Sequence, residues 1–484
     1  MKRVLSKINT PIKILIKLLL VFCLSAFIVY KLDDTLYNKE ANYGKGYKSL
    51  PVNSLDYIVL GSSHAQYSFI PSVIYEKTGL YGYVLGSACQ PLEVSYEMLK
   101  EACKTQSPKL VILEAYTALP LSDICMEDAC YVIAENQMTG EEKINTINFL
   151  PEDKASQYYI DFLTYHNSWR NSDFLDTIRN PKSKMNETNY SFGYIEYNFK
   201  YNGEGNYWRP MYNPDDVYDV ELREKDLESL NKIYDYCKAN NIQLIMYKTP
   251  IDGMDDENYS YLQKEWQWAK EKGIEYIDFH KEAFDLDFYM VVHSSAFHSY
   301  VSGSCLISNF IGDRLNEYDL SFEHRENEFL NDLYNGDYQN VTINYLFTEN
   351  DPIKYLNHLA YNKGIISFRY VVGENMPSEK FISEIKALGL KDFDGTKDTY
   401  AIIYDGEVLS CVEENTNIEA TINGVNFVVG KEGIFTDGML HNKEEINCNL
   451  VYYKNDMSIY ADKNIDIQEY AIWDAYEYNY HRNW

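Results

Sequence analysis

The chain has little positive charge for its length. Its 484 residues include 44 Lys and Arg against 73 Asp and Glu, giving a formal net charge of −29. A protein that binds the phosphate backbone of DNA or RNA needs clustered Lys and Arg. The composition therefore argues against nucleic acid as a partner, and the acidic surplus is typical of a well-solvated surface.

The sequence also lacks a cysteine pattern for metal binding. None of its nine Cys lies in a C-x-x-C pair or beside a His-rich stretch, so we predict no metal site and no cofactor. Cys125 and Cys130 are close enough in sequence to pair in an oxidising compartment. Scattered buried thiols are the alternative for most of the cysteines.

Apolar and aromatic residues are plentiful. Hydrophobic residues make up 45% of the chain, which is enough for real cores, and the length predicts two domains, with three as the alternative. Tyrosine is unusually frequent, with 46 residues. It supplies contact area suited to sugars, although codon bias in a low-GC genome would have the same result.

The first 32 residues predict a membrane anchor. Basic residues precede an apolar stretch from Ile12 to Leu32, which orients the N-terminus toward the cytoplasm. Its uncharged core, Leu18–Tyr30, is short for a span of roughly 20 residues, but Lys17 and Lys31 can snorkel and extend it. We predict a cytoplasmic tip and single-pass signal anchor in the cell membrane, with the bulk of the chain extracytoplasmic. A cleaved signal peptide and a buried helix are the alternatives.

Residues 33–325 predict an α/β domain with a mainly parallel sheet covered by helices on both faces. The expected strands are Tyr57–Leu60, Tyr83–Leu85, Leu110–Leu113, Gln243–Tyr247 and Tyr276–Phe279, and the expected helices are Val94–Ala102, 227–237, Tyr261–Lys272 and Ser304–Leu315. The stretch 116–215 is rich in Tyr, Asn and Asp, and we interpret it as an insertion that could form a lid or substrate rim.

Residues 326–484 predict a connecting segment, 327–361, and a smaller β-rich α+β accessory domain. The expected elements are strands at Ile365–Val372, Tyr400–Tyr404, Glu407–Cys411, Ile418–Ile422, Val425–Val429 and Asn449–Tyr453, with one helix at Ser378–Leu388. The dipeptides Asp405-Gly406 and Asn423-Gly424 are strong signals for tight hairpins.

A serine turn follows the first predicted strand, in Gly61-Ser62-Ser63-His64. Open α/β folds bind ligands at the carboxyl ends of their strands, so Ser63 is a candidate nucleophile. An ordinary strand-to-loop turn is the alternative.

A hydroxyl nucleophile needs a base and donors for an oxyanion. His298, just before the last predicted helix of this domain, is the candidate base, and His293 is a second. The backbone of Ser63, Gly86 and the side chain of Gln90 are the candidate oxyanion donors.

These residues resemble the SGNH/GDSL hydrolase superfamily. The resemblance covers about residues 50–318 and rests on Gly61-Ser62-Ser63-His64, on Gly86 with Gln90, and on His298 with Gly303. It implies a flavodoxin-like three-layer α/β/α sandwich, with Ser63 as nucleophile and His298 as base. It also implies an oxyanion hole built from Ser63, Gly86 and a third polar residue.

Within that superfamily the chain is similar to membrane-anchored, extracytoplasmic D-alanyl transfer and polysaccharide O-acetylation proteins. The stretch Tyr165–Trp169 resembles a recurrent segment of that group. We take His166 and Trp169, together with His64, as candidate substrate-binding residues. Helix packing is the alternative for the first two.

Two positions depart from the superfamily pattern. Ser295 stands where an Asp usually precedes the catalytic His, and Asp285 or Asp287 could replace that Asp only if the loop folds back. Glu114 stands where an Asn usually follows the third strand, and a carboxylate there would repel an oxyanion unless it were protonated or turned away. A degenerate site is therefore an alternative to an active one.

The second domain resembles, over roughly 365–470, the interleukin-like EMT inducer (PANDER-like) domain. The resemblance rests on a helix ending at Gly389, on Asp398–Ile403 and on Ile446–Tyr453. It implies a non-catalytic accessory module with a capacity for glycan binding. An unrelated β-rich packing domain is the alternative.

The leading hypothesis is a membrane-anchored cell-envelope acyl esterase or O-acyltransferase that acts on a surface polysaccharide through Ser63 and His298. The alternative is a catalytically degenerate SGNH domain that serves as a glycan-binding or assembly factor for envelope polysaccharide. The expected partners are the membrane, an envelope polysaccharide or acyl donor, and a membrane acyltransferase.

Overall fold

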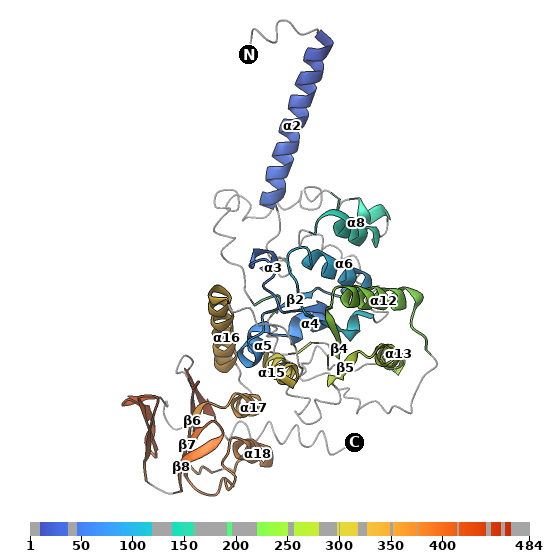
Figure 1. The fold of residues 1–484 in the computed structure, drawn as a ribbon. Coiled ribbons are helices and arrows are strands. Elements are labelled where there is room, and N and C mark those ends of the chain that lie inside the picture. Colours follow the sequence, from blue (N-terminus) through green and yellow to red (C-terminus); the bar gives the residue numbers. More distant parts are fainter. Residues whose placement is uncertain are drawn as a thin grey trace.

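The computed structural model describes residues 10–36, 46–118, 138–150, 152–156, 158–159, 191–195, 220–249, 256–279, 298–299, 301–317, 327–348, 352–374, 376–413, 416–441, 447–455 and 460–465. Every structural feature below lies in these residues. Figure 1 shows a long helix that stands apart, a central α/β unit, and β-rich sheets formed by the C-terminal part of the chain.

The central unit is built on a parallel five-stranded sheet in the order β2-β1-β3-β4-β5. The strands are β1 (Tyr57–Gly61), β2 (Gly82–Gly86), β3 (Leu110–Glu114), β4 (Gln243–Lys248) and β5 (Glu275–Asp278). This order is that of flavodoxin-like doubly wound sheets, in which strand order reverses beside β1. The predicted α/β fold class is confirmed, and each predicted strand lies within one residue of its observed position.

Helices cover both faces of this sheet. Helices α4 (Ser63–Ser68), α5 (Pro71–Thr78) and α15 (Val301–Glu317) pack on one face, and α6 (Leu92–Ala102), α8 (Gly140–Asn148), α12 (Glu224–Ala239) and α13 (Asp256–Lys272) pack on the other. Alternate residues of a strand point to opposite faces. Val59 accordingly belongs to the first core, whereas Ile58 and Leu60 belong to the second.

Short elements complete the central unit. They are α3 (Gly46–Ser49), the 3₁₀ turn η2 (Ala115–Ala118) and α9 (Glu152–Ala155). Most of the predicted insertion, 116–215, lies outside the described residues. Its expected role as a lid or substrate rim stays a prediction.

Residues 327–361 form two helices, α16 (Glu328–Thr348) and α17 (Pro352–Asn362), rather than the mixed connecting segment expected from the sequence. Many of their apolar residues are buried against the central unit, although Phe329 is exposed. Leu330 and Tyr334 join one core of the parallel sheet, and Tyr338 and Leu356 join the other. Burial against the rest of the protein therefore stabilises these two helices in a segment with many polar residues.

The C-terminal region contains two antiparallel sheets and the helix α18 (Glu379–Ala387), in agreement with the β-rich prediction. The five-stranded sheet has the order β14-β13-β6-β7-β8, and the four-stranded sheet has the order β12-β11-β10-β9. The strands are β6 (Ile365–Tyr370), β7 (Thr399–Tyr404), β8 (Glu407–Glu413), β9 (Ile418–Ile422), β10 (Val425–Gly430), β11 (Gly433–Thr436), β12 (Met439–Leu440), β13 (Cys448–Tyr453) and β14 (Tyr460–Ile465).

Both predicted hairpin turns have the expected geometry. Asp405 and Gly406 have φ of 52° and 81°, and Asn423 and Gly424 have φ of 51° and 84°. Two consecutive positive φ values define the type I′ turn, whose twist matches that of paired strands. These turns connect β7 to β8 and β9 to β10.

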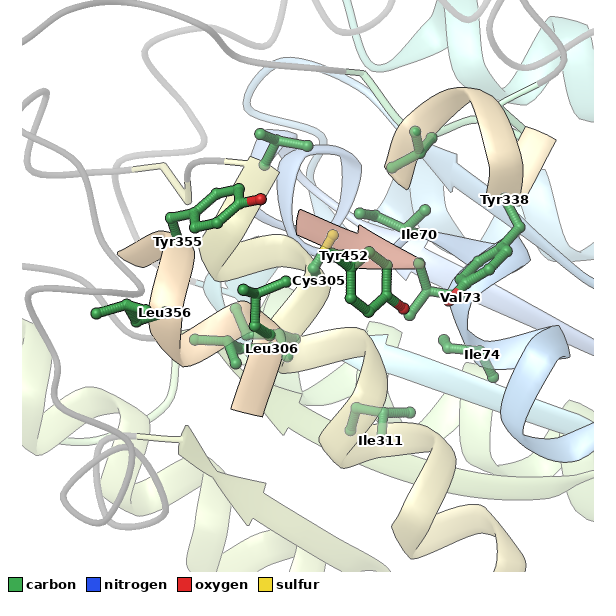
Figure 2. Packing of buried hydrophobic residues seen from close by; sticks show 14 of the residues in the cluster. Ile70, Val73, Ile74, Cys305, Leu306, Ile311, Tyr338, Tyr355, Leu356 and Tyr452 are labelled. Carbon is green, nitrogen blue, oxygen red and sulfur yellow. The ribbon is translucent and has the colours of Figure 1, made fainter. Parts of the chain in front are cut away.

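The two regions share one hydrophobic core. Figure 2 shows Tyr452 of β13 beside Cys305 of α15 and Val73 of α5. At the same junction Lys454 Nζ lies 2.8 Å from Glu76 Oε1. The antiparallel sheet is therefore packed directly on the helices that line one face of the parallel sheet. The domain boundary near residue 326 stays a prediction.

The N-terminal helix α2 (Thr10–Leu36) can cross a membrane by length and composition. Its segment Pro11–Ile28 has a mean hydropathy of 2.3 and is not buried against the protein. An 18-residue helical segment is about 27 Å long. This is compatible with the predicted single span, while the side of the membrane stays a prediction.

Candidate active site

The serine turn lies at the carboxyl end of β1, in the middle of the parallel sheet. Strand β1 ends at Gly61, and α4 begins two residues later at Ser63. Ser62 has extended backbone angles and caps α4, because its Oγ accepts a hydrogen bond of 3.2 Å from His64 N. The cap places Ser63 as the first helical residue, half-buried at the sheet edge.

The structure brings the predicted nucleophile and base together. His298 Nε2 lies 2.9 Å from Ser63 Oγ, although the two residues are 235 positions apart in the sequence. This distance is within direct hydrogen-bonding range for a hydroxyl and its base.

Polar contacts between α4 and the start of α15 hold the two segments together. Ser299 Oγ lies 3.2 Å from Ser68 Oγ, and the Ser304 hydroxyl donates to the carbonyl oxygen of Tyr67. Ser308 Oγ accepts a hydrogen bond of 2.8 Å from Ile70 N. These bonds fix the entry of α15, and His298 lies three residues before its first residue.

His298 is a neutral base at neutral pH. Burial lowers its pKa to about 4, because desolvation disfavours the imidazolium. The ring packs against Tyr67, with centroids 4.5 Å apart, and the His64 ring lies 5.3 Å away. In the tautomer that leaves Nε2 unprotonated, a neutral imidazole at this distance can accept the hydroxyl proton of Ser63.

Glu114 faces Ser62 from the end of β3. Its Oε2 accepts a hydrogen bond of 2.8 Å from Ser62 Oγ, and its Oε1 accepts one of 2.8 Å from Tyr116 N. The side chain has no exposed surface, and burial raises its pKa to about 8. The carboxyl group is therefore engaged inside the turn and largely protonated at neutral pH.

Two glycines make this turn possible. A Cβ on Gly86 would lie 2.9 Å from the carbonyl oxygen of Ser62, so the end of β2 can approach the turn only as glycine. A Cβ on Gly61 would lie 2.5 Å from the Cβ of Glu114. Gly86 thus lies against the nucleophile turn, as expected for an oxyanion donor, but its donor role stays a prediction.

Gln90 is fully buried and holds its own loop together. Its Nε2 donates to Leu85 O at 3.2 Å and to Ser95 Oγ at 2.9 Å, while its Oε1 accepts from Ser87 Oγ at 3.1 Å. Both amide hydrogens are thereby used within residues 85–95. The observed geometry supports a bracing role, and the sequence-based assignment as an oxyanion donor has no contact in its favour.

His64 lies beside the dyad but is covered by another ring. It stacks on Tyr116, with ring centroids 4.2 Å apart and an interplanar angle of 19°. Burial, followed by repulsion from His298, holds the pKa of His64 well below its usual range. The residue is therefore a neutral, mostly buried neighbour of the site, and its substrate-binding role stays a prediction.

Several predicted residues lie outside the described residues. They are His166, Trp169, Asp285, Asp287, His293 and Ser295, together with Cys125 and Cys130. The third member of a triad and the proposed disulfide stay predictions. In the described part of the chain no group of three or more His, Cys, Asp or Glu is arranged to hold a metal ion.

Two aromatic residues of the site were missed from the sequence. Tyr116 follows the carboxyl end of β3 and stacks on His64, and Tyr67 lies four residues after Ser63 on α4 and packs on His298. Spacing offered a signal in both cases. Residues i and i+4 share a helix face, and residues just after a parallel strand lie at the ligand edge of the sheet.

Comparisons with known proteins give low-identity structural neighbours. One is a protein from Desulfitobacterium hafniense DCB-2 described as lipolytic and of the G-D-S-L family, with 11% identity and a TM-score of 0.29, covering 54% of this chain and 99% of its own. Another is a protein from Bacteroides fragilis NCTC 9343 described as an acylhydrolase, with 13% identity and a TM-score of 0.28, covering 57% of this chain and 94% of its own. No family model and no curated protein matches the sequence.

Proposed function

We infer that this protein is a serine acyl-ester hydrolase or acyltransferase with Ser63 as nucleophile and His298 as base. The observation that carries this is the distance of 2.9 Å between Ser63 Oγ and His298 Nε2 at the carboxyl edge of a doubly wound sheet. A neutral imidazole and a hydroxyl, both partly buried at a sheet edge, are the parts that nucleophilic acyl transfer needs.

The reaction follows from that pair. His298 Nε2 takes the proton of Ser63 as Oγ bonds to the ester carbonyl carbon, and the carbonyl oxygen becomes an oxyanion. Backbone N–H groups of Ser63 and Gly86 are the assigned oxyanion donors. His298 then returns the proton to the leaving alcohol, the ester C–O bond breaks, and an acyl-enzyme on Ser63 remains.

The acceptor of the acyl group separates an esterase from a transferase. Water gives hydrolysis, and a sugar hydroxyl gives O-acylation. We assign a surface polysaccharide of the cell envelope as substrate. The apolar helix α2 supports a membrane location, and the net charge of −29 disfavours a polyphosphate. The C-terminal region is assigned as an accessory module, with a membrane acyltransferase as candidate donor partner.

The first test uses the full chain in detergent. We expect wild type to release p-nitrophenol from p-nitrophenyl acetate above the Ser63→Ala background, and a fluorophosphonate probe to label wild type but not Ser63→Ala. To separate transfer from hydrolysis, acetylated or deacetylated polysaccharide is then added together with the ester. Mass spectrometry of the sugar shows whether it has gained or lost acyl groups. Equal rates of p-nitrophenol release by wild type and Ser63→Ala, with no labelling of either protein, would contradict the assignment as an enzyme.

A degenerate glycan-binding or assembly factor is the second candidate. The observation in its favour is Glu114, whose fully buried carboxyl group occupies the strand end where an amide donor was expected. This candidate predicts glycan binding that Ser63→Ala leaves unchanged, with no labelling of either protein. Retention on immobilised envelope polysaccharide measures it.

A further inference from the structure

Glu114 makes contacts that the reaction above does not use. It lies at the end of β3, beside β1, and Leu113 is in register with Leu60. The absence of a side chain at Gly61 leaves room for it, since a Cβ there would lie 3.3 Å from Glu114 Oε2 as well as 2.5 Å from its Cβ. A small residue in the nucleophile turn thus admits a carboxyl group to the back of the turn.

The carboxyl group closes a ring of contacts around Ser63. Glu114 Oε2 accepts from Ser62 Oγ at 2.8 Å, and that same Oγ accepts from His64 N at 3.2 Å. The ring of His64 stacks on Tyr116, whose backbone N–H donates to Glu114 Oε1 at 2.8 Å. Ser63 lies between two members of this ring of contacts, and the His64 side chain lies next to His298.

We propose that Glu114 is the positioning residue of the Ser63–His298 dyad, because its buried carboxyl group fixes Ser62 and the backbone of Tyr116. This rests on the function proposed above. The carboxyl group does not touch the reacting atoms, and its role is to hold the serine turn in place against the stacked rings of His64 and Tyr116. Displacing a reacting group by about 1 Å can lower a rate by about 10²-fold, so the contacts of Glu114 that hold Ser63 in place are expected to affect kcat.

The surroundings of Glu114 favour its neutral form. Burial raises its pKa to about 8, and this effect outweighs the hydrogen bonds from Ser62 and from the backbone N–H of Tyr116, which act in the opposite direction. The ionisable groups that interact with it from neighbouring elements are Tyr247 of β4, Glu265 of α13 and Tyr276 of β5, and ionisation of any of them would add negative charge. An anion at position 114 would also oppose the developing oxyanion.

The pH dependence has a definite sign. Glu114 is neutral below its pKa of about 8 and charged above it, while His298 is unprotonated above about 4. Activity therefore rises as the pH increases through the pKa of His298 and falls as the pH increases through that of Glu114.

The experiment compares Glu114→Gln with Glu114→Ala in the full chain in detergent. We expect Glu114→Ala to lower kcat on p-nitrophenyl acetate by about 10- to 100-fold. Glutamine keeps the shape and cannot ionise, so Glu114→Gln should restore kcat at pH 7 to within about threefold and abolish the fall of activity above pH 8.

Asp337→Asn is the matched control. Asp337, on α16, is a second buried carboxyl group, with a pKa raised by burial to about 7. Its removal should leave the alkaline fall in place. The proposal would be overturned if Glu114→Ala kept the wild-type kcat and pH profile. It would also be overturned if Glu114→Ala and Glu114→Gln lowered kcat equally. If Glu114→Ala does not fold, the pH profile of Glu114→Gln decides.

A spectroscopic readout separates this proposal from the proposed function. If wild type hydrolyses no ester, the proposed function is wrong. Side-chain NMR of histidine-labelled protein still tests whether Glu114 positions the two histidines. We expect the signals of His64 and His298 to move in Glu114→Ala and to keep their positions in Glu114→Gln. Unmoved signals in both variants would overturn the positioning role.

Discussion

The parallel sheet and the antiparallel sheets bury polar groups in different ways. At the carboxyl edge of the parallel sheet, Ser62 and Glu114 are buried next to Ser63, which is only partly buried. In the C-terminal sheets, polar side chains pair with each other: the ring of His441, which directly follows β12, bonds to Thr436 of β11. The first arrangement leaves a reactive group accessible, and the second is closed on itself.

The difference follows from topology. Parallel strands bring several carboxyl ends to one edge, so residues from β1, β2 and β3 converge there without forming part of the hydrogen-bonded ladder. Antiparallel hairpins alternate direction, and their strand ends are used by tight turns such as Asn423-Gly424. Chemistry is therefore expected in the first region, and packing and recognition in the second.

The largest expected effect comes from comparing one histidine of each region. His298→Ala should lower kcat on p-nitrophenyl acetate by about 10³-fold, because the general base is lost. His441→Ala should leave kcat unchanged and cost about 1–3 kcal/mol in the free energy of unfolding, because Thr436 loses a buried partner. Ester kinetics and denaturant titration measure the two, and comparable losses of kcat would remove the distinction between the regions.

Truncation of the shared core tests whether the two regions are stabilised together. Tyr452 is buried among residues of both regions, and Tyr452→Ala should cost about 3–5 kcal/mol and lower the unfolding midpoint of both. Phe427→Ala is the matched truncation, since Phe427 belongs to a core confined to the C-terminal sheets.

Thermal loss of activity, which reports on the central unit, is compared with loss of far-UV circular dichroism. We expect Tyr452→Ala to lower both midpoints and Phe427→Ala to leave the thermal midpoint of activity nearer to wild type. Identical shifts of both midpoints in the two variants would indicate a single cooperative unit with no separate C-terminal core.

The smallest effect compares two helix caps. Ser378 Oγ accepts from Phe381 N at 3.1 Å at the start of α18, as Ser62 Oγ accepts from His64 N at α4. Ser378→Ala should cost about 1 kcal/mol of stability and leave kcat unchanged. Ser62→Ala should also lower kcat, because Glu114 loses its partner in the nucleophile turn. Equal kinetics in the two variants would show that Ser62 is a cap alone.

Much of this architecture is written in local patterns. Apolar runs such as Tyr57–Leu60 predicted the strands, and Asp405-Gly406 predicted a hairpin that has the expected φ values. The helices α16 and α17 were not predicted, although Ile353, Leu356 and Leu359 of α17 recur at helical spacing, and burial against distant elements stabilises both helices. Sequence spacing placed Ser63 and His298 at one edge of the sheet, but not at 2.9 Å from each other.

The sequence by itself determined that a serine turn follows the first strand and that a histidine precedes the last helix of the α/β unit. Only the tertiary structure decided which groups surround them: Tyr67 on His298, Tyr116 on His64, and Glu114 behind Ser62. The physical reason is that strands, helices and turns follow from the residues next to each other in the chain. Burial and the pKa of a carboxyl group depend instead on neighbours from strands far apart in the sequence.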